Sequence, residues 1–184
     1  MDDEKTYTAF ADMNLVASGP LAQVLKALKS RFDRDSGSLV LTFEDQTGRQ
    51  VDFDLRGTLA EVEARYRPAP ARVGPGRPKL GVVAREVSLL PRHWEWLEQQ
   101  PSGASAAIRR LVEAARKQDP GEQQSRAAVE ATGRFLSAMA GNLPEYEEVS
   151  RALYARERGQ FDDLIREWPS DIREHAQRLA RGAF

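Results

Sequence analysis

The chain has 184 residues, of which 41% are hydrophobic and 30% are charged, and its formal net charge at pH 7 is −1. This length is enough to bury one large core or two small ones, and the nearly balanced total charge does not by itself point to a polyanion partner. No cysteine is present, which excludes a disulfide framework, a thiol nucleophile and a thiolate metal site.

Residues 1–66 predict a small module with the element order ββαββα. Four short segments, alternating or apolar and bounded by turn residues, are expected to be strands: 6–10, 13–17, 39–43 and 51–55. Pro20 stands where the first turn of a helix would begin, and apolar residues follow it at helical spacing. Residues 45–48 supply a turn between the last two strands, and Thr58 is expected to cap a second, short helix.

Residues 67–79 are rich in proline, glycine and arginine. Because proline cannot continue a helix or an inner strand, this segment is predicted to be a linker. Its tripeptide Gly76-Arg77-Pro78 resembles the core of an AT-hook, an extended segment that lies in the narrow minor groove of A·T-rich DNA. The resemblance implies that Arg77, Pro78 and Lys79 contact DNA; the alternative is a solvated basic tether.

Residues 80–118 predict one strand followed by two helices. The strand would run from Val82 to Leu90, and Pro91 would open an aromatic helix. A Gly-Ala-Ser turn at residues 103–105 leads into the second helix. In a monomer the apolar strand would leave an exposed β-edge, which favours pairing with a second copy of the chain.

Residues 80–118 contain a series of positions that match the loose consensus of a known family. These positions are Leu90-Pro91 at the strand end, Trp94 and Leu97 in the first helix, Gly103 and Ser105 in the turn, and Ile108-Arg109 with Leu111 in the second helix. In this order they resemble the ribbon-helix-helix family of dimeric DNA-binding regulators. In that family two strands pair into a ribbon that enters the major groove, and the helices of both copies form one core. The expected dimer core consists of Val83, Val87, Leu89, Trp94, Leu97, Ile108 and Leu111.

The parity of the strand decides which side chains would face the DNA. If Val83, Val87 and Leu89 face the core, Ala84, Glu86 and Ser88 face the groove. A register shifted by one residue would expose Arg85 and Val87 instead, but it would bury the Glu86 carboxylate, which is less favourable. A carboxylate in the groove can accept from cytosine but repels phosphate, so a strand that serves only dimerisation is the alternative. The DNA contacts predicted for this segment are Arg85, Glu86, Ser88, Arg92 and Ser105, the last at a helix N-terminus suited to phosphate.

Residues 119–184 predict a helical bundle or arm. Apolar side chains recur at helical spacing in four runs, separated by Gly141-Asn142 with Pro144, by a short polar stretch, and by Trp168-Pro169. The four expected helices contain, in chain order, Phe135, Val149, Phe161 and His175.

Charge is unevenly distributed along the chain. Residues 72–117 carry 9 basic and 4 acidic side chains, whereas residues 1–71 and residues 118–184 each carry 9 basic and 12 acidic ones. A basic middle between acidic ends is typical of a polyanion-binding segment. Arginines that only cap and solvate helices would give the same count.

Four motifs spread over most of the chain: Gly76–Gly81, Leu90–Leu97, Arg109–Leu111 and Phe135–Gly141. Together they resemble the bacterial family of uncharacterised proteins catalogued as domain of unknown function 2239. The resemblance implies no established activity, so any function has to be argued from the residues.

The sequence contains few features that are typical of an enzyme active site. His93 and His175 lie in different segments without metal-ligand spacing, and the acidic clusters have the pattern of solvated helix faces. No phosphate loop and no Gly-x-Ser-x-Gly elbow is present. We therefore expect no enzyme activity, no cofactor and no metal. The acidic start and the lack of a long apolar run favour a cytoplasmic protein without a membrane partner.

The sequence as a whole predicts an α+β protein with an N-terminal ββαββα module, a central ribbon-helix-helix segment and a C-terminal helical bundle or arm. We expect a homodimeric regulator of transcription that binds double-stranded DNA. The alternative is a non-enzymatic protein-interaction module, antitoxin-like or adaptor-like. It would dimerise through the central strand and bind a protein partner at its acidic ends.

Overall fold

The computed structural model describes residues 5–35, 37, 39–67, 83, 85–118 and 120–184. Its backbone contacts divide the chain into two units. The first, here called the sheet unit, consists of residues 1–67 and 121–184, and the second, the insert, consists of residues 68–120. The sequence patterns separate the N-terminal module from the C-terminal helices, whereas in the structure these two segments belong to one unit.

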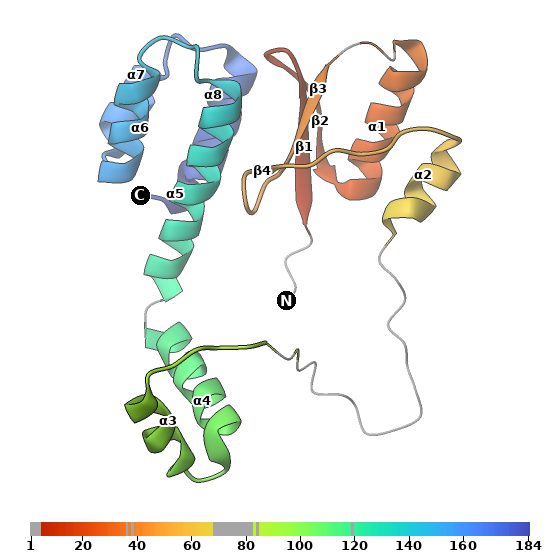
Figure 1. The fold of residues 1–184 in the computed structure, drawn as a ribbon. Coiled ribbons are helices and arrows are strands. Elements are labelled where there is room, and N and C mark those ends of the chain that lie inside the picture. The colour runs from red at the N-terminus through yellow and green to blue at the C-terminus, as the bar shows by residue number, and fades with distance from the viewer. Residues whose placement is uncertain (1–4, 36, 38, 68–82, 84, 119) are drawn as a thin grey trace. The chain divides into compact units, whose positions relative to one another are not determined.

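The sheet unit is built on a four-stranded antiparallel sheet with the order β2-β1-β3-β4 (Figure 1). Its strands are β1 (Thr6–Ala11), β2 (Asn14–Pro20), β3 (Val40–Glu44) and β4 (Arg49–Gln50). The predicted hairpin of residues 6–10 and 13–17 is confirmed, because β1 pairs with β2 across a turn at Asp12, where φ is 52°. The mixed α+β class is confirmed as well.

The strand predicted over residues 51–55 is wrong, because β4 covers only Arg49–Gln50. The Val51 amide still donates to a carbonyl of β3, at 2.8 Å. Farther along, however, the Asp54 amide donates to the Tyr66 hydroxyl, at 2.5 Å. The regular pairing with β3 thus ends at Gln50, and the Asp54 amide is bound by a side chain of the following helix.

Two helices, α1 (Leu21–Arg34) and α2 (Leu59–Tyr66), lie on one side of the sheet (Figure 1). Val24 and Leu28 of α1 pack on Ala9 of β1 and form a small core there. The cap predicted at Thr58 is confirmed: its hydroxyl accepts from the Glu61 amide, and the Glu61 carboxylate accepts from the Thr58 amide at 2.7 Å. This reciprocal capping box fixes where α2 begins.

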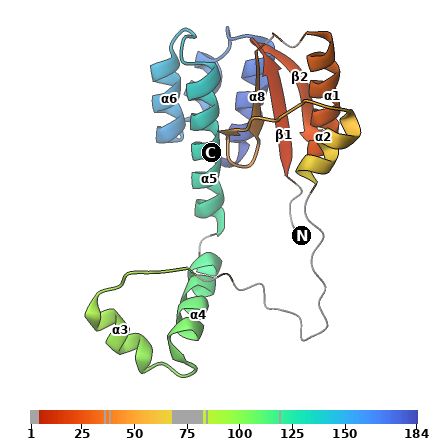
Figure 2. The same ribbon diagram turned by 45° about the vertical axis from the view of Figure 1, so that its right-hand side comes forward.

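The other side of the sheet is covered by helices from the last segment of the chain (Figures 1 and 2). They are α5 (Pro120–Met139), α6 (Tyr146–Ala155), α7 (Arg158–Leu164) and α8 (Ser170–Leu179), so the four helices predicted from the sequence are confirmed. Phe135 of α5 packs on Phe10 and Phe43 of the sheet, with ring centroids 5.6 and 5.2 Å apart. The main core of the unit therefore lies between the sheet and these helices.

The turn between β3 and β4 packs directly onto α5. Gly48 in this turn has a φ of 63°, and a Cβ built on it would lie 1.9 Å from the Ala131 carbonyl oxygen. Arg134 of α5 donates from Nη1 to the Thr47 carbonyl, at 2.7 Å. Only glycine fits this position, so the turn holds the sheet and the helix in close contact.

A polar cluster joins α8 to the sheet. Arg178 donates to the hydroxyls of Thr8 and Ser18, at 3.2 and 3.4 Å, and the Thr8 hydroxyl donates to Asp45, at 2.8 Å. Arg178 also donates to Nδ1 of His175, which makes that nitrogen an acceptor and leaves the ring proton on Nε2. Nε2 is buried without a hydrogen-bond partner and lies 3.8 Å from Oδ1 of Asp45.

The described part of the insert contains two helices, α3 (Pro91–Glu98) and α4 (Gly103–Gln118), joined by a short loop (Figure 2). Pro91 stands at the start of α3, as predicted. Ser102 and Gly103 enter α4 with φ values of 72° and 77°. Residues 85–90, part of the predicted strand, belong to neither a helix nor a strand of this single chain.

Candidate dimerisation and nucleic-acid interface

The insert buries few of its side chains. Among its described residues only Leu97 and Ala107 are buried hydrophobics. The sheet unit, in contrast, contains a continuous core of buried side chains from both the sheet and the helices. Because a stable fold needs a core that excludes water, two buried side chains are too few to hold two helices together in isolation.

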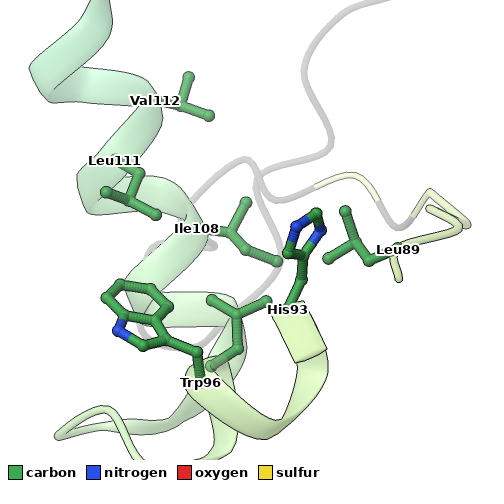
Figure 3. Close-up of a pocket in the computed structure, with 7 residues that line it drawn as sticks. Leu89, His93, Trp96, Ile108, Leu111 and Val112 are labelled. Atoms are coloured by element: carbon green, nitrogen blue, oxygen red, sulfur yellow. The ribbon is translucent and has the colours of Figure 1, made fainter. Parts of the chain in front are cut away.

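An open apolar cleft of about 340 Å³ lies between α3 and α4. Figure 3 shows side chains of both helices, and Leu89 from the segment that precedes α3, turned toward this space. The residues that line it are Leu89, His93, Trp96, Leu97, Ile108, Leu111 and Val112. Water in such a cleft contacts almost only apolar atoms, so filling it with apolar side chains is favourable.

The structure brings four of the seven predicted dimer-core residues to this cleft. Leu97 is buried, Leu89 and Ile108 are half-buried, and Leu111 lines the cleft with half of its surface exposed. The remaining three are exposed in the single chain: Val83, Val87 and Trp94. The predicted core is therefore an apolar surface that this chain alone leaves open.

Sequence reasoning missed three residues that line the cleft, His93, Trp96 and Val112. Val112 follows Ile108 by four residues, and this spacing on one face of a helix is the signal that could have identified it. His93 and Trp96 are three residues apart and share a face of α3 in the same way. Because the ring of His93 is polar, this pair does not appear in the spacing of apolar residues.

The predicted DNA contacts in the described part of the insert are all on the surface: Arg85, Glu86, Ser88, Arg92 and Ser105. Among the described residues, neither Arg85 nor Arg92 has an ion-pair partner, and the same holds for Arg109 and Arg110 of α4, which are exposed too. Unpaired guanidinium groups on a surface are available to bind phosphate. The predicted contacts Arg77, Pro78 and Lys79 lie outside the described residues.

The first turn of α4 is open to an approaching ligand. A Cβ built on Gly103 would meet no atom of the described residues within 4 Å, so none of them covers this side of the turn. Its φ of 77° is a conformation that favours glycine, and Ser105 is exposed in the same turn. The amides at the start of a helix carry partial positive charge, which makes such a turn suitable for phosphate.

Other kinds of site find no support in the described part of the chain. There, His, Asp and Glu side chains nowhere gather in groups of three or more that could hold a metal ion. None of the helices described is long and apolar enough to cross a membrane. In the sheet unit, burial and then the Arg178 charge lower the pKa of His175 to about 3, but no described cleft opens onto its ring.

Residues 6–180 match a family described as an uncharacterized protein conserved in bacteria, DUF2239. The chain belongs to this family. The match runs from the start of β1 to the end of α8 and confirms the resemblance carried by the four sequence motifs. No curated protein and no solved structure matches the chain.

Proposed function

We propose that this protein is a dimeric DNA-binding regulator of transcription, in which two inserts together form a ribbon-helix-helix unit. The observation that carries the proposal is the open apolar cleft between α3 and α4. Next to it, residues 85–90 have no strand partner within the described chain. A second copy would supply both missing parts, a strand that pairs with this segment and side chains that fill the cleft.

Apolar side chains that are exposed in the single chain would contribute to such an association. Val87, Trp94, Trp96 and Leu111 each expose between 37% and 55% of their surface in the single chain. Full burial of one such side chain stabilises by about 1.5–3 kcal/mol, so burying the exposed half of each contributes about 1 kcal/mol. Both copies contribute equally in a symmetric dimer, which doubles the gain.

The charge of the insert supports DNA as the partner of the dimer. Arg92 stands at the start of α3, directly after the segment that would form the ribbon, and has no ion-pair partner in the part of the chain that the structure describes. The open first turn of α4 offers amides to a phosphate. In a two-fold symmetric dimer each of these groups occurs twice, so several phosphates can be bound along one duplex.

One observation favours the alternative function. Glu86 is exposed and, by strand parity, would share the outer face of the ribbon with Ser88. A carboxylate repels the DNA backbone, whereas an acidic ribbon suits a protein partner. The second candidate is therefore a protein-interaction module that dimerises in the same way but binds no nucleic acid.

Sedimentation of the full chain with the variants Leu89→Lys and Leu39→Lys tests the dimer. Both change leucine to lysine, but Leu89 lines the cleft, whereas Leu39 is 73% exposed in the sheet unit. A lysine buried at the cleft would carry its charge into the shared core, so Leu89→Lys should sediment as a monomer. The wild type and Leu39→Lys should sediment as dimers. A monomeric wild type at micromolar concentration would contradict the proposal.

DNA binding is tested separately, by titrating labelled duplexes with the full chain at several salt concentrations. Phosphate contacts release counterions, so the affinity should fall steeply as salt rises. A dimer that binds no duplex, or binds with no dependence on salt, would support the protein-interaction module instead.

A further inference from the structure

One titratable side chain, that of His93, lines the apolar cleft between α3 and α4. In Figure 3 its ring lies between Leu89 and Ile108 and is turned toward the same space as these two side chains. The His93 amide donates to the Leu90 carbonyl, at 2.8 Å, so the residue belongs to the first turn of α3. The helix thus holds a group whose charge can change against a surface that is otherwise apolar.

The surroundings of His93 offer nothing that would stabilise a charged ring. The six other residues that line the cleft, from α3, α4 and the segment before α3, carry aliphatic side chains or an indole. Among the described residues no carboxylate pairs with the ring and no group forms a hydrogen bond with it. Several charged side chains of these three elements lie close to the lining residues in sequence, but all are exposed and none lines the cleft: Glu86, Arg92, Glu95, Glu98, Arg109, Arg110 and Glu113.

The chain has only one other histidine, His175, and it stays neutral near neutral pH. Burial in the sheet unit, and then the charge of Arg178, lower the pKa of His175 to about 3. Histidine is the side chain that ordinarily gains or loses its charge between about pH 5 and pH 8. His93 is therefore the histidine of this chain that can connect a change of pH in this range to an event in the insert.

We propose that His93 makes the association of two copies depend on pH, so that the dimer forms at neutral pH and dissociates on acidification. This inference rests on the proposed function, because it needs a second copy that closes the cleft. Closing the cleft takes the ring out of water, which costs far more for a charged imidazole than for a neutral one. The proton therefore binds the single chain in preference to the dimer, and proton binding opposes association.

The symmetry of the dimer sets the size of the effect. Each copy contributes one His93, so two protons are taken up when one dimer dissociates. Each proton can change the dissociation constant by at most about tenfold per pH unit, which gives at most about 100-fold for the pair. Because proton uptake is incomplete close to neutral pH, we expect a total increase of about tenfold to 100-fold between pH 7.5 and pH 5.5.

Sedimentation equilibrium of the full chain at several pH values between 7.5 and 5.5 tests this inference. The dissociation constant of the wild type should rise about tenfold or more over this range. His93→Leu and His93→Gln cannot bind the proton, so both should lose most of the pH dependence. His175→Gln is the matched control, with circular dichroism to verify its fold, and should keep the dependence of the wild type because His175 stays neutral here.

The outcomes distinguish this inference from the proposed function. A wild type that is monomeric at every pH would overturn both. A dimer whose dissociation constant is independent of pH would overturn the role of His93 alone. The same conclusion would follow if the wild type and the two His93 variants showed equal pH dependence, and the dimer itself would then still stand.

A second measurement follows the two histidine rings directly by nuclear magnetic resonance, with His93→Gln to assign the signals. The wild type is titrated at protein concentrations below and above the dissociation constant measured at pH 7.5. The His93 signal should titrate at lower pH in the concentrated sample, because the closed cleft excludes the proton. The same midpoint at both concentrations would show that the ring remains in water in the dimer and would overturn the proposal.

Discussion

Many arginines of the sheet unit form ion pairs with carboxylates of the same chain, whereas the described part of the insert contains arginines that do not. In the sheet unit, Arg156 donates twice to the Glu122 carboxylate, at 2.8 Å each, and Arg134 pairs with Glu130 at 2.7 Å. In the insert, Arg92 and Arg109 are exposed and have no ion-pair partner among the described residues. A paired arginine is already neutralised by its own chain, whereas an unpaired one can bind an external anion. The excess of basic side chains in residues 72–117 therefore includes arginines that can bind an external anion, although the net charge of the whole chain is only −1.

The two units also differ in how completely their cores exclude water. Phe10, Phe43 and Phe135 are completely buried in the sheet unit, whereas Trp94 and Trp96 of the insert remain partly exposed. A closed core indicates a unit that folds within one chain, and an open one indicates a unit that is completed by another molecule. The comparison predicts that substitutions in the first unit affect folding, while those in the second affect association and binding.

The largest effect is expected for Phe135→Ala. The ring contacts Phe10, Phe43 and His175, so its removal leaves a cavity where the sheet meets the helices. We expect the free energy of unfolding to fall by about 3–5 kcal/mol in urea denaturation followed by circular dichroism. Trp94→Ala in the insert is the matched control and should leave this transition of the sheet unit nearly unchanged. Equal losses would mean that the two units share one core.

The pH dependence of unfolding provides the second test. Burial, and then the Arg178 charge, lower the pKa of His175 to about 3, against about 6.5 in an unfolded chain. Between these values the unfolded chain binds a proton that the folded protein does not. The resulting stabilisation is therefore complete above about pH 6.5 and is lost as the pH falls toward 3, by at most about 1.4 kcal/mol per pH unit.

Urea denaturation between pH 7 and pH 4 measures this slope. His175→Gln removes the titrating group and should flatten the dependence, whatever its effect on the stability at pH 7. A wild-type slope that His175→Gln does not reduce would show that groups other than His175 determine it.

Much of the fold followed from local patterns. The hairpin of β1 and β2, the cap at Thr58 and the helices α5 to α8 were all predicted, because periodicity and capping residues act within a few positions of the chain. Local patterns cannot reveal which distant faces meet. The contact of Phe135 with Phe10 joins segments 125 positions apart, so the common core of the first and last segments could not be predicted.

β4 is shorter than the alternation of residues 51–55 predicts. In this segment the Tyr66 hydroxyl accepts from the Asp54 amide. A contact with a side chain 12 positions away leaves no trace in the local alternation. In the candidate interface, apolar spacing identified Leu89, Leu97 and Ile108, whereas His93 was missed because its ring is polar although it lines an apolar cleft.

The salt dependence of DNA affinity provides a test at the level of single arginines. If Arg92 binds one phosphate, Arg92→Ala should reduce the slope of log affinity against log salt by about one. Arg151 of the sheet unit pairs with Glu148 at 2.9 Å, so Arg151→Ala should leave the slope unchanged. Measuring both variants on one duplex separates a specific contact from a change in total charge. Equal changes would show that only the total charge matters.

The smallest expected effect concerns Arg77, which lies outside the described residues but carries the AT-hook resemblance. If Arg77 enters a narrow minor groove, Arg77→Ala should weaken binding to A·T-rich duplexes severalfold more than to G·C-rich ones, because the narrow groove has the stronger negative potential. Light scattering should still give a dimer, since the proposed interface involves the cleft of the insert. Equal losses on both duplexes would show that Arg77 contacts phosphate alone. No loss on either would leave Gly76-Arg77-Pro78 as a tether, with DNA binding then resting on Arg92 and the first turn of α4.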